Sequence, residues 1–155
     1  MPTDLLEELH QRKPFSSLAQ EAHLNVSRTQ ARLQEGLEQV LKPYGLSGTQ
    51  YNVLRILRGA DRRGLCRNEL RDRLLTRMPD VTRLLDRMEE AGLVTRERDT
   101  MDRRLVTTRL TERGRELVDA LDGPVAEEHE RRLGHLGEER LRVLVRLLTL
   151  VRHPG

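Results

Sequence analysis

The spacing of hydrophobic residues changes once along this chain, and the change narrows the folds that it can adopt. From Leu18 to Met88, apolar residues recur at the three- and four-residue spacings of a buried helix face. Residues 93–97 and 105–110 are instead rich in β-branched residues, which favours strands. Helical spacing then returns from Leu117 to Val151. This order predicts a mainly α-helical protein with one small β-hairpin.

Capping residues and helix breakers predict where the first two helices begin and end. A long helix is expected at 18–41, where the following Lys-Pro pair ends it. A second is expected at 47–59, with Leu46 and Tyr51 at the two positions of a hydrophobic staple. The residues with capping-box spacing are Ser17 with Gln20 and Ser47 with Gln50.

Two shorter helices are expected next, separated by a turn. The third, at about 67–75, has no good capping side chain at its start. Pro79 suits the first position of the fourth helix, where no backbone N–H is needed, and Gly92 suits its end. The expected buried face is Val81, Leu84, Leu85 and Met88, and the expected exposed face is Asp80, Thr82, Arg83, Asp86 and Arg87.

The C-terminal part of the chain is expected to be helical after the hairpin. The hairpin has a charged tip at 98–104, and Thr111 is expected to cap the next helix, with a kink at Gly123-Pro124. A last helix is expected at about 138–152. Its apolar face comprises Leu141, Leu144, Leu148 and Val151, widened by Val145, Leu147 and Leu150. That surface exceeds what a helix of a monomer needs.

Charge is unevenly distributed along the chain, although the net charge is only +3. Residues 60–115 carry fifteen arginines against eleven acidic residues, whereas residues 116–155 are net negative. Arginine donates paired hydrogen bonds to phosphates and to guanine edges. The basic middle segment is therefore a candidate nucleic-acid-binding region.

Composition excludes several other classes of protein. The single cysteine, Cys66, excludes an internal disulfide framework and multi-cysteine zinc sites. The apolar run at 143–151 is too short to span a bilayer, and no signal-peptide pattern is present, so we expect a cytoplasmic protein. The serines, histidines and glycines form no active-site or phosphate-loop pattern. We expect no enzyme activity, no cofactor and no metal site.

Helix, helix, turn, helix and β-hairpin, in that order, form a winged helix-turn-helix. In this arrangement a short helix supports a second one, whose exposed face enters a DNA major groove about 12 Å wide. The hairpin tip lies beside it, where the narrow minor groove attracts arginine. We expect one domain, 1–155, with the winged helix-turn-helix lobe at 46–110.

Three segments carry a more specific pattern: QYNVLRIL at 50–57, PDVTRLLDRMEEAGLVTR at 79–96 and DRRLVTTRLTERG at 102–114. They resemble the multiple antibiotic resistance regulator (MarR) family of transcription factors. The resemblance covers about residues 15–152, because the flanking helices fall where that family has its dimerisation helices. It implies that residues 15–42 and 112–152 form a dimer interface.

The resemblance also implies roles for individual residues. The positions that match base and phosphate contacts on the recognition helix are Thr82, Arg83 and Arg87, with Asp80 and Asp86 as lesser candidates. In the wing, Arg104 matches the arginine that enters the minor groove, and Asp102 matches the acid that orients its guanidinium. Arg98 and Arg103 match phosphate contacts. The expected dimer contacts are Leu141, Leu144, Leu148 and Val151.

By the same resemblance, we expect a homodimer, mainly a repressor, that binds a pseudo-palindromic double-stranded operator. A small aromatic or anionic effector would release it, and His23 is a candidate contact for that ligand. Two other hypotheses remain open: a winged-helix module that binds a protein partner and not DNA, and a redox-sensing regulator that acts through Cys66. The second is disfavoured, because the sensing cysteines of the family lie near the N-terminus.

Overall fold

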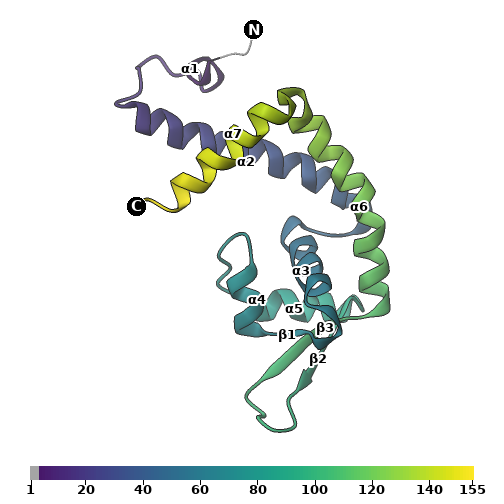
Figure 1. Ribbon diagram of the computed structural model, residues 1–155. Helices are drawn as coiled ribbons and strands as arrows, with labels where there is room; N and C mark the ends of the chain where they lie inside the picture. The colour runs from purple at the N-terminus through teal and green to yellow at the C-terminus, as the bar shows by residue number, and fades with distance from the viewer. Residues whose placement is uncertain (1–3) are drawn as a thin grey trace.

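A computed structural model describes residues 4–155. Figure 1 shows two lobes, one made of long helices and a smaller one made of short helices and a sheet. Helix α6 (Glu112–Leu133) runs from the small lobe into the long-helix lobe. Within this part of the chain, no helix is long and apolar enough to cross a membrane.

The elements confirm the expected order. The long-helix lobe comprises α6 together with α1 (Leu5–Glu8), α2 (Leu18–Leu41) and α7 (Gly137–Arg152). The small lobe comprises α3 (Gly48–Gly59), α4 (Arg67–Arg73), α5 (Val81–Glu90), β1 (Leu65–Cys66), β2 (Val94–Arg98) and β3 (Val106–Leu110). The third helix ends two residues earlier than expected.

The two expected capping boxes have different outcomes. At the start of α3 both bonds form: Ser47 Oγ accepts from the Gln50 amide at 3.2 Å, and the Gln50 side chain accepts from the Ser47 amide at 3.0 Å. At the start of α2 only the first forms, because Ser17 Oγ accepts from the Gln20 amide at 3.1 Å. The Gln20 side-chain oxygen instead accepts from the amide and hydroxyl of Ser16.

The start of α5 differs from the prediction that Pro79 is its first residue. The helix begins at Val81, and Asp80 is its N-cap, with a carboxylate oxygen that accepts from the Arg83 amide at 3.0 Å. The prediction was wrong because a helix beginning at Pro79 would have Met78 as its cap. Methionine has no oxygen acceptor, whereas aspartate is among the strongest N-caps.

The sheet has three antiparallel strands in the order β1-β3-β2, so it is larger than the predicted hairpin. In the hairpin, Val94 pairs with Leu110 and Arg98 pairs with Val106. The missed strand, β1, pairs Leu65 with Thr108. It follows Gly64, which has a φ of +73° and on which a Cβ would lie 2.5 Å from the Thr108 carbonyl oxygen.

One hydrophobic core fills the small lobe and continues onto α6. Leu54, Leu70 and Met88 are fully buried within the lobe, and Val118 and Leu121 of α6 are fully buried against it. This packing attaches the small lobe to the start of α6. In contrast, α7 contributes no fully buried residue.

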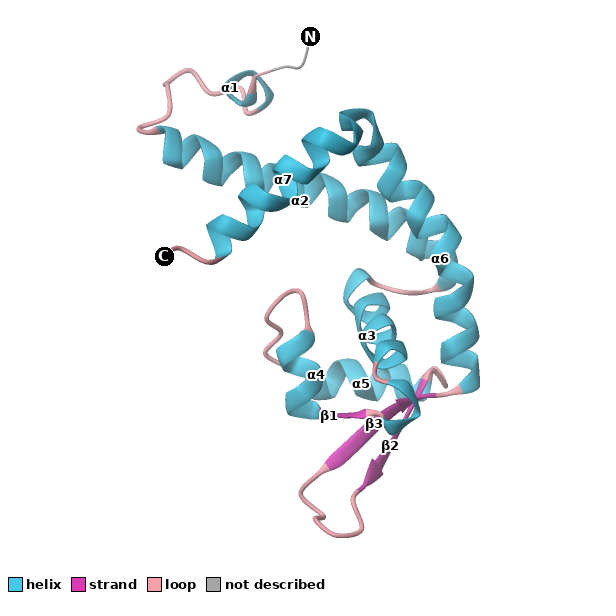
Figure 2. Ribbon diagram, in the orientation of Figure 1, coloured by secondary structure: helices cyan, strands magenta, loops and turns pink. Residues whose placement is uncertain are grey.

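Helix α6 continues through Pro124, where a kink is expected. Proline removes one backbone donor from a helix, and its ring crowds the preceding turn. Figure 2 shows the helix curving along its length as it passes from the sheet to the long-helix lobe. The curve carries the end of α6 over toward α2, and the chain then reverses direction into α7.

Candidate nucleic-acid interface

Helix α5 presents a basic and polar face to solvent, as its sequence predicts. Its four apolar residues, Val81, Leu84, Leu85 and Met88, are at most 7% exposed. Thr82, Arg83 and Arg87 lie on the opposite, exposed face. Among the side chains that the structure describes, Arg83 and Arg87 form no ion pair. Both guanidinium groups are therefore available to an external acceptor.

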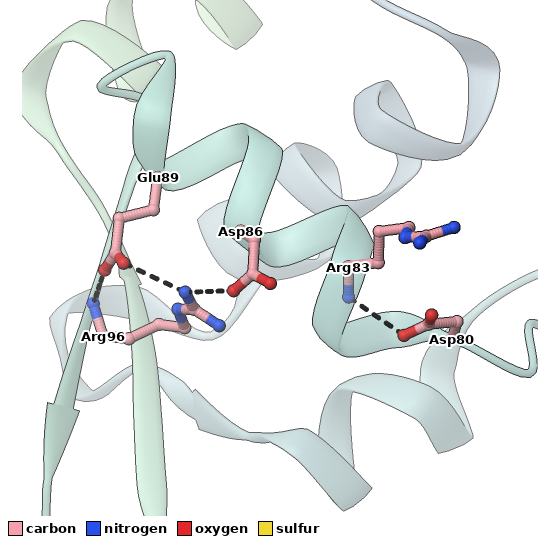
Figure 3. Close-up of polar contacts among 5 residues, drawn as sticks. All are labelled: Asp80, Arg83, Asp86, Glu89 and Arg96. Carbon is pink, nitrogen blue, oxygen red and sulfur yellow. Dashed lines mark hydrogen bonds and ion pairs between the residues drawn. The ribbon is translucent and has the colours of Figure 1, made fainter.

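The two aspartates of this face are already engaged within the protein. Asp80 caps the helix through the Arg83 amide, and Asp86 accepts a hydrogen bond from the Arg96 guanidinium at 2.5 Å (Figure 3). A carboxylate that pairs with an arginine has less capacity to accept from a cytosine amino group. We therefore assign both to the protein's own structure rather than to base contacts.

Arg96 of β2 connects the wing to α5, a contact that the sequence analysis did not predict. Its guanidinium donates to Asp86 and to Glu89, the latter at 3.0 Å, and its amide also donates to Glu89 at 3.0 Å. These bonds from Arg96 lower the pKa of Glu89, and the bond to Glu89 raises the pKa of Arg96. Only the three-residue spacing of the two acids on one helix could have hinted at a shared partner.

The wing tip is shaped by Asp99. Its carboxylate accepts from the amides of Met101 and Asp102 at 2.7 and 3.2 Å, and its own amide donates to the Leu105 carbonyl at 2.8 Å. These amide bonds lower the pKa of Asp99. The Asp99 carboxylate thus binds the tip's own backbone. Met101 at the tip is 95% exposed.

Asp102 and Arg104 are neighbours at the tip, but they do not form the contact that the resemblance implies. The Asp102 carboxylate accepts from the Arg104 backbone amide at 3.0 Å. No ion pair joins the two side chains in the described chain. The acid is therefore bonded to the backbone of the arginine and not to its guanidinium. Close by, the Arg98 guanidinium donates to the Arg103 carbonyl at 3.4 Å, and both side chains are exposed.

A cavity of about 270 Å³ lies where α4, α5 and the wing meet. Thr82 of α5 and Arg104 of the wing both line it, together with Arg96 and Cys66. The tertiary structure therefore brings the start of the predicted recognition helix and the predicted minor-groove arginine onto one surface, although they are far apart in the sequence.

The predicted dimer contacts on α7 divide into two groups. Leu141, Leu144 and Leu148 are half-buried within the protomer, whereas Val151 is 71% exposed. The other exposed apolar side chains of this helix are 50–64% exposed: Val143, Val145, Leu147 and Leu150. The free apolar surface of α7 is thus centred on residues expected to widen the interface, because the three leucines partly face the chain itself.

The candidates His23 and Cys66, and the buried Glu128, occupy ordinary structural positions. His23 is exposed on α2, and Cys66 is half-buried at the N-cap of α4, where its amide donates to the Glu69 carboxylate at 2.9 Å. Glu128 is 4% exposed and pairs with Arg131 and Arg132. Among the described residues, no cluster of three or more histidine, cysteine or acidic side chains could hold a metal ion.

Comparison with known proteins agrees with this architecture. A MarR family model matches residues 44–105. The crystal structure of a MarR transcription factor from Planctomyces limnophilus is 42% identical, with a TM-score of 0.69, over 88% of this chain and 99% of that chain. The transcriptional regulator FarR of Neisseria gonorrhoeae is 29% identical over 83% of this chain and 88% of its own length.

Two further solved structures of proteins named CouR contain different ligands. The transcriptional repressor CouR, bound to a 23-mer DNA duplex, is 28% identical with a TM-score of 0.79, over 92% of this chain and 100% of that chain. CouR from Rhodococcus jostii RHA1, bound to p-coumaroyl-CoA, is 25% identical with a TM-score of 0.72, over 91% of this chain and 98% of that chain. With its winged-helix lobe, its exposed basic helix and these relatives, this chain belongs to the MarR family of DNA-binding transcriptional regulators.

Proposed function

We propose that this regulator is a homodimer that represses transcription by binding a pseudo-palindromic operator. In each protomer, α5 enters a major groove while the wing reaches the adjoining minor groove. The observation that carries the proposal is the common surface of α5 and the wing, where Thr82 and Arg104 line one cavity. The relative CouR, solved on a DNA duplex, supports this docking.

The exposed side chains of the two elements suit different parts of the duplex. Arg83 and Arg87 can donate paired hydrogen bonds to guanine or bind phosphates, and Thr82 can contact either a base or the backbone. Arg104 at the wing would meet the negative potential of the minor groove. Arg98 and Arg103 would hold phosphates on either side of it. We keep these six residues as the proposed DNA-binding set, together with Asp102, whose carboxylate accepts from the Arg104 backbone amide.

A second copy is needed to explain the surface of α7. Its exposed apolar residues, centred on Leu147, would be left in water in a monomer. Residues 15–42 and 112–152 would form the interface, leaving 46–110 as the DNA-binding lobe. Two lobes related by a twofold axis would place two α5 helices about 34 Å apart, one helical turn of DNA.

Release by a small molecule is the last part of the proposal. A ligand that prefers one spacing of the two α5 helices would shift the dimer toward that spacing and change its DNA affinity. The p-coumaroyl-CoA complex of CouR supports an aromatic or anionic effector. His23 on α2 remains a candidate contact for it.

The test is binding of the purified protein to its own upstream promoter DNA at two salt concentrations. Tight, salt-dependent and sequence-selective binding is expected, and Arg104→Ala should weaken it by about 1–3 kcal/mol. Arg12→Ala is the matched control, because it removes the same charge from an exposed position between α1 and α2, outside residues 46–110. The proposal would be contradicted if the protein bound every duplex weakly and neither substitution changed that binding. This result would favour a module that binds a protein partner.

A further inference from the structure

We propose that Arg96 is a positioning residue that holds the wing at a fixed distance from α5, and so determines which minor-groove position Arg104 meets. This inference rests on the proposed function, because it concerns how two DNA-contacting elements are held together. Arg96 itself is not assigned a DNA contact.

The contacts of Arg96 join the two elements at three points. Its guanidinium lies 2.5 Å from an Asp86 carboxylate oxygen and 3.0 Å from Glu89, and its amide donates to the second Glu89 oxygen (Figure 3). The Arg96 side chain is only 21% exposed, whereas those of Asp86 and Glu89 are 53% and 41% exposed. One arginine thus contacts two acidic residues that lie three positions apart on the same side of α5.

The same residue is tied to the rest of the wing. Arg96 pairs with Thr108 in the β2–β3 ladder, and Thr108 also pairs with Leu65 of β1. A movement of β2 relative to α5 would therefore carry the whole sheet. Arg96 also lines the cavity that the two proposed DNA-contacting residues, Thr82 and Arg104, share.

This placement has a consequence for binding. The major-groove and minor-groove contacts form together only if the spacing of α5 and the wing matches the duplex. A wing held in place before binding loses less conformational freedom on the DNA than a loose one. Arg96 therefore determines how much the Arg104 contact contributes to DNA affinity. The contacts that α5 makes with the DNA do not depend on Arg96 and stay largely unchanged.

The experiment is a double-mutant cycle on operator affinity with the full-length protein. It uses Arg96→Gln, Arg104→Ala and the double variant, with Arg83→Ala combined in the same way as the control. In the otherwise unchanged protein, Arg104→Ala is expected to weaken binding about tenfold. In the Arg96→Gln background, its penalty should fall to about twofold or less, whereas the penalty of Arg83→Ala should stay unchanged. The preference for base pairs flanking the α5 site should also weaken.

A merely structural role gives a different pattern. In that case Arg96→Gln lowers the unfolding temperature, the Arg104→Ala penalty remains about tenfold, and the inference is overturned. A role in charge screening is tested by the variant Asp86→Asn, Glu89→Gln, Arg96→Gln, which removes all three charges. If that variant restores the full Arg104→Ala penalty, screening accounts for the effect and the inference again fails. Absence of any operator binding by the unchanged protein would instead refute the proposed function.

Discussion

Arg58 of α3 and Asp122 of α6 form a two-point ion pair, in which Nη1 and Nη2 each donate to one carboxylate oxygen at 2.9 Å. Nη1 also donates to Asp119 at 2.8 Å. The partners are 64 positions apart in the sequence. Together with the buried contacts of Val118 and Leu121, this pair attaches the DNA-binding lobe to the helix that leads into the proposed dimer interface.

Arg58→Met should lower the free energy of unfolding at pH 7 by up to about 1 kcal/mol, because it removes charge-assisted hydrogen bonds to two acids that are each 57% exposed to solvent. The bonds from Arg58 lower the pKa of Asp122 in the folded protein. Their stabilisation is therefore present above the ordinary aspartate pKa of about 3.9, and it is lost as pH falls through the lower folded-state pKa. Urea unfolding at pH 7 and at several lower values measures this. The prediction is contradicted if the difference in free energy of unfolding between Arg58→Met and the unchanged protein stays constant at low pH. The control is Arg55→Met, at an exposed position of the same helix.

Gly114→Ala should destabilise the protein by about 1–3 kcal/mol, because the added methyl has no room. A Cβ at Gly114 would lie 2.1 Å from the Leu93 carbonyl oxygen and 3.3 Å from Leu110. The matched control is Gly123→Ala in the same helix, where nothing lies within 4 Å of the Cβ position. That change should stabilise α6 by roughly 0.5–1 kcal/mol. Chemical denaturation of both variants checks the pair, and equal effects of the two would refute the close approach at Gly114.

Thr111→Val should cost about 1–2 kcal/mol of stability, because it removes the N-cap of α6. The Thr111 hydroxyl accepts from the Gly114 amide at 3.0 Å and donates to the Gly92 carbonyl at 2.6 Å. It therefore joins the first turn of α6 to the end of α5. Thr111→Ser keeps the hydroxyl and should recover most of the loss in thermal unfolding. A serine variant as unstable as the valine variant would show that packing of the methyl group matters more.

Leu147→Asp should yield a folded monomer if α7 forms the proposed dimer interface. Leu147 is 55% exposed in the protomer, so a charge there disturbs little within one chain. It is a sharper test than Leu144→Asp, because Leu144 is half-buried. Sedimentation measures the mass and circular dichroism the helix content. The control is Leu75→Asp, at an 80% exposed position between α4 and α5. If the Leu147→Asp protein remains a dimer, the interface lies elsewhere on the molecule.

The features that the sequence alone determined are those that depend on near neighbours. Ser47 and Gln50 bond to each other's amides across one helical turn, and Thr111 caps α6 through an amide three residues away. The buried face of α5 follows from helical spacing alone. In the same way, the two β-rich segments predicted the β2–β3 hairpin, because a strand pair joined by a short tip is a local structure.

Only the tertiary structure decided the contacts between distant segments. Strand β1 is two residues long, too short to show a period, and it exists because Leu65 lies beside β3. The Arg96 contacts needed β2 and α5 to be placed side by side before the acids of one could meet the guanidinium of the other. Leu141, Leu144 and Leu148 share a face with Val151 in sequence, but folding half-buries those three and leaves Val151 exposed. Helical spacing predicts which residues share a face, whereas only tertiary packing determines what that face contacts.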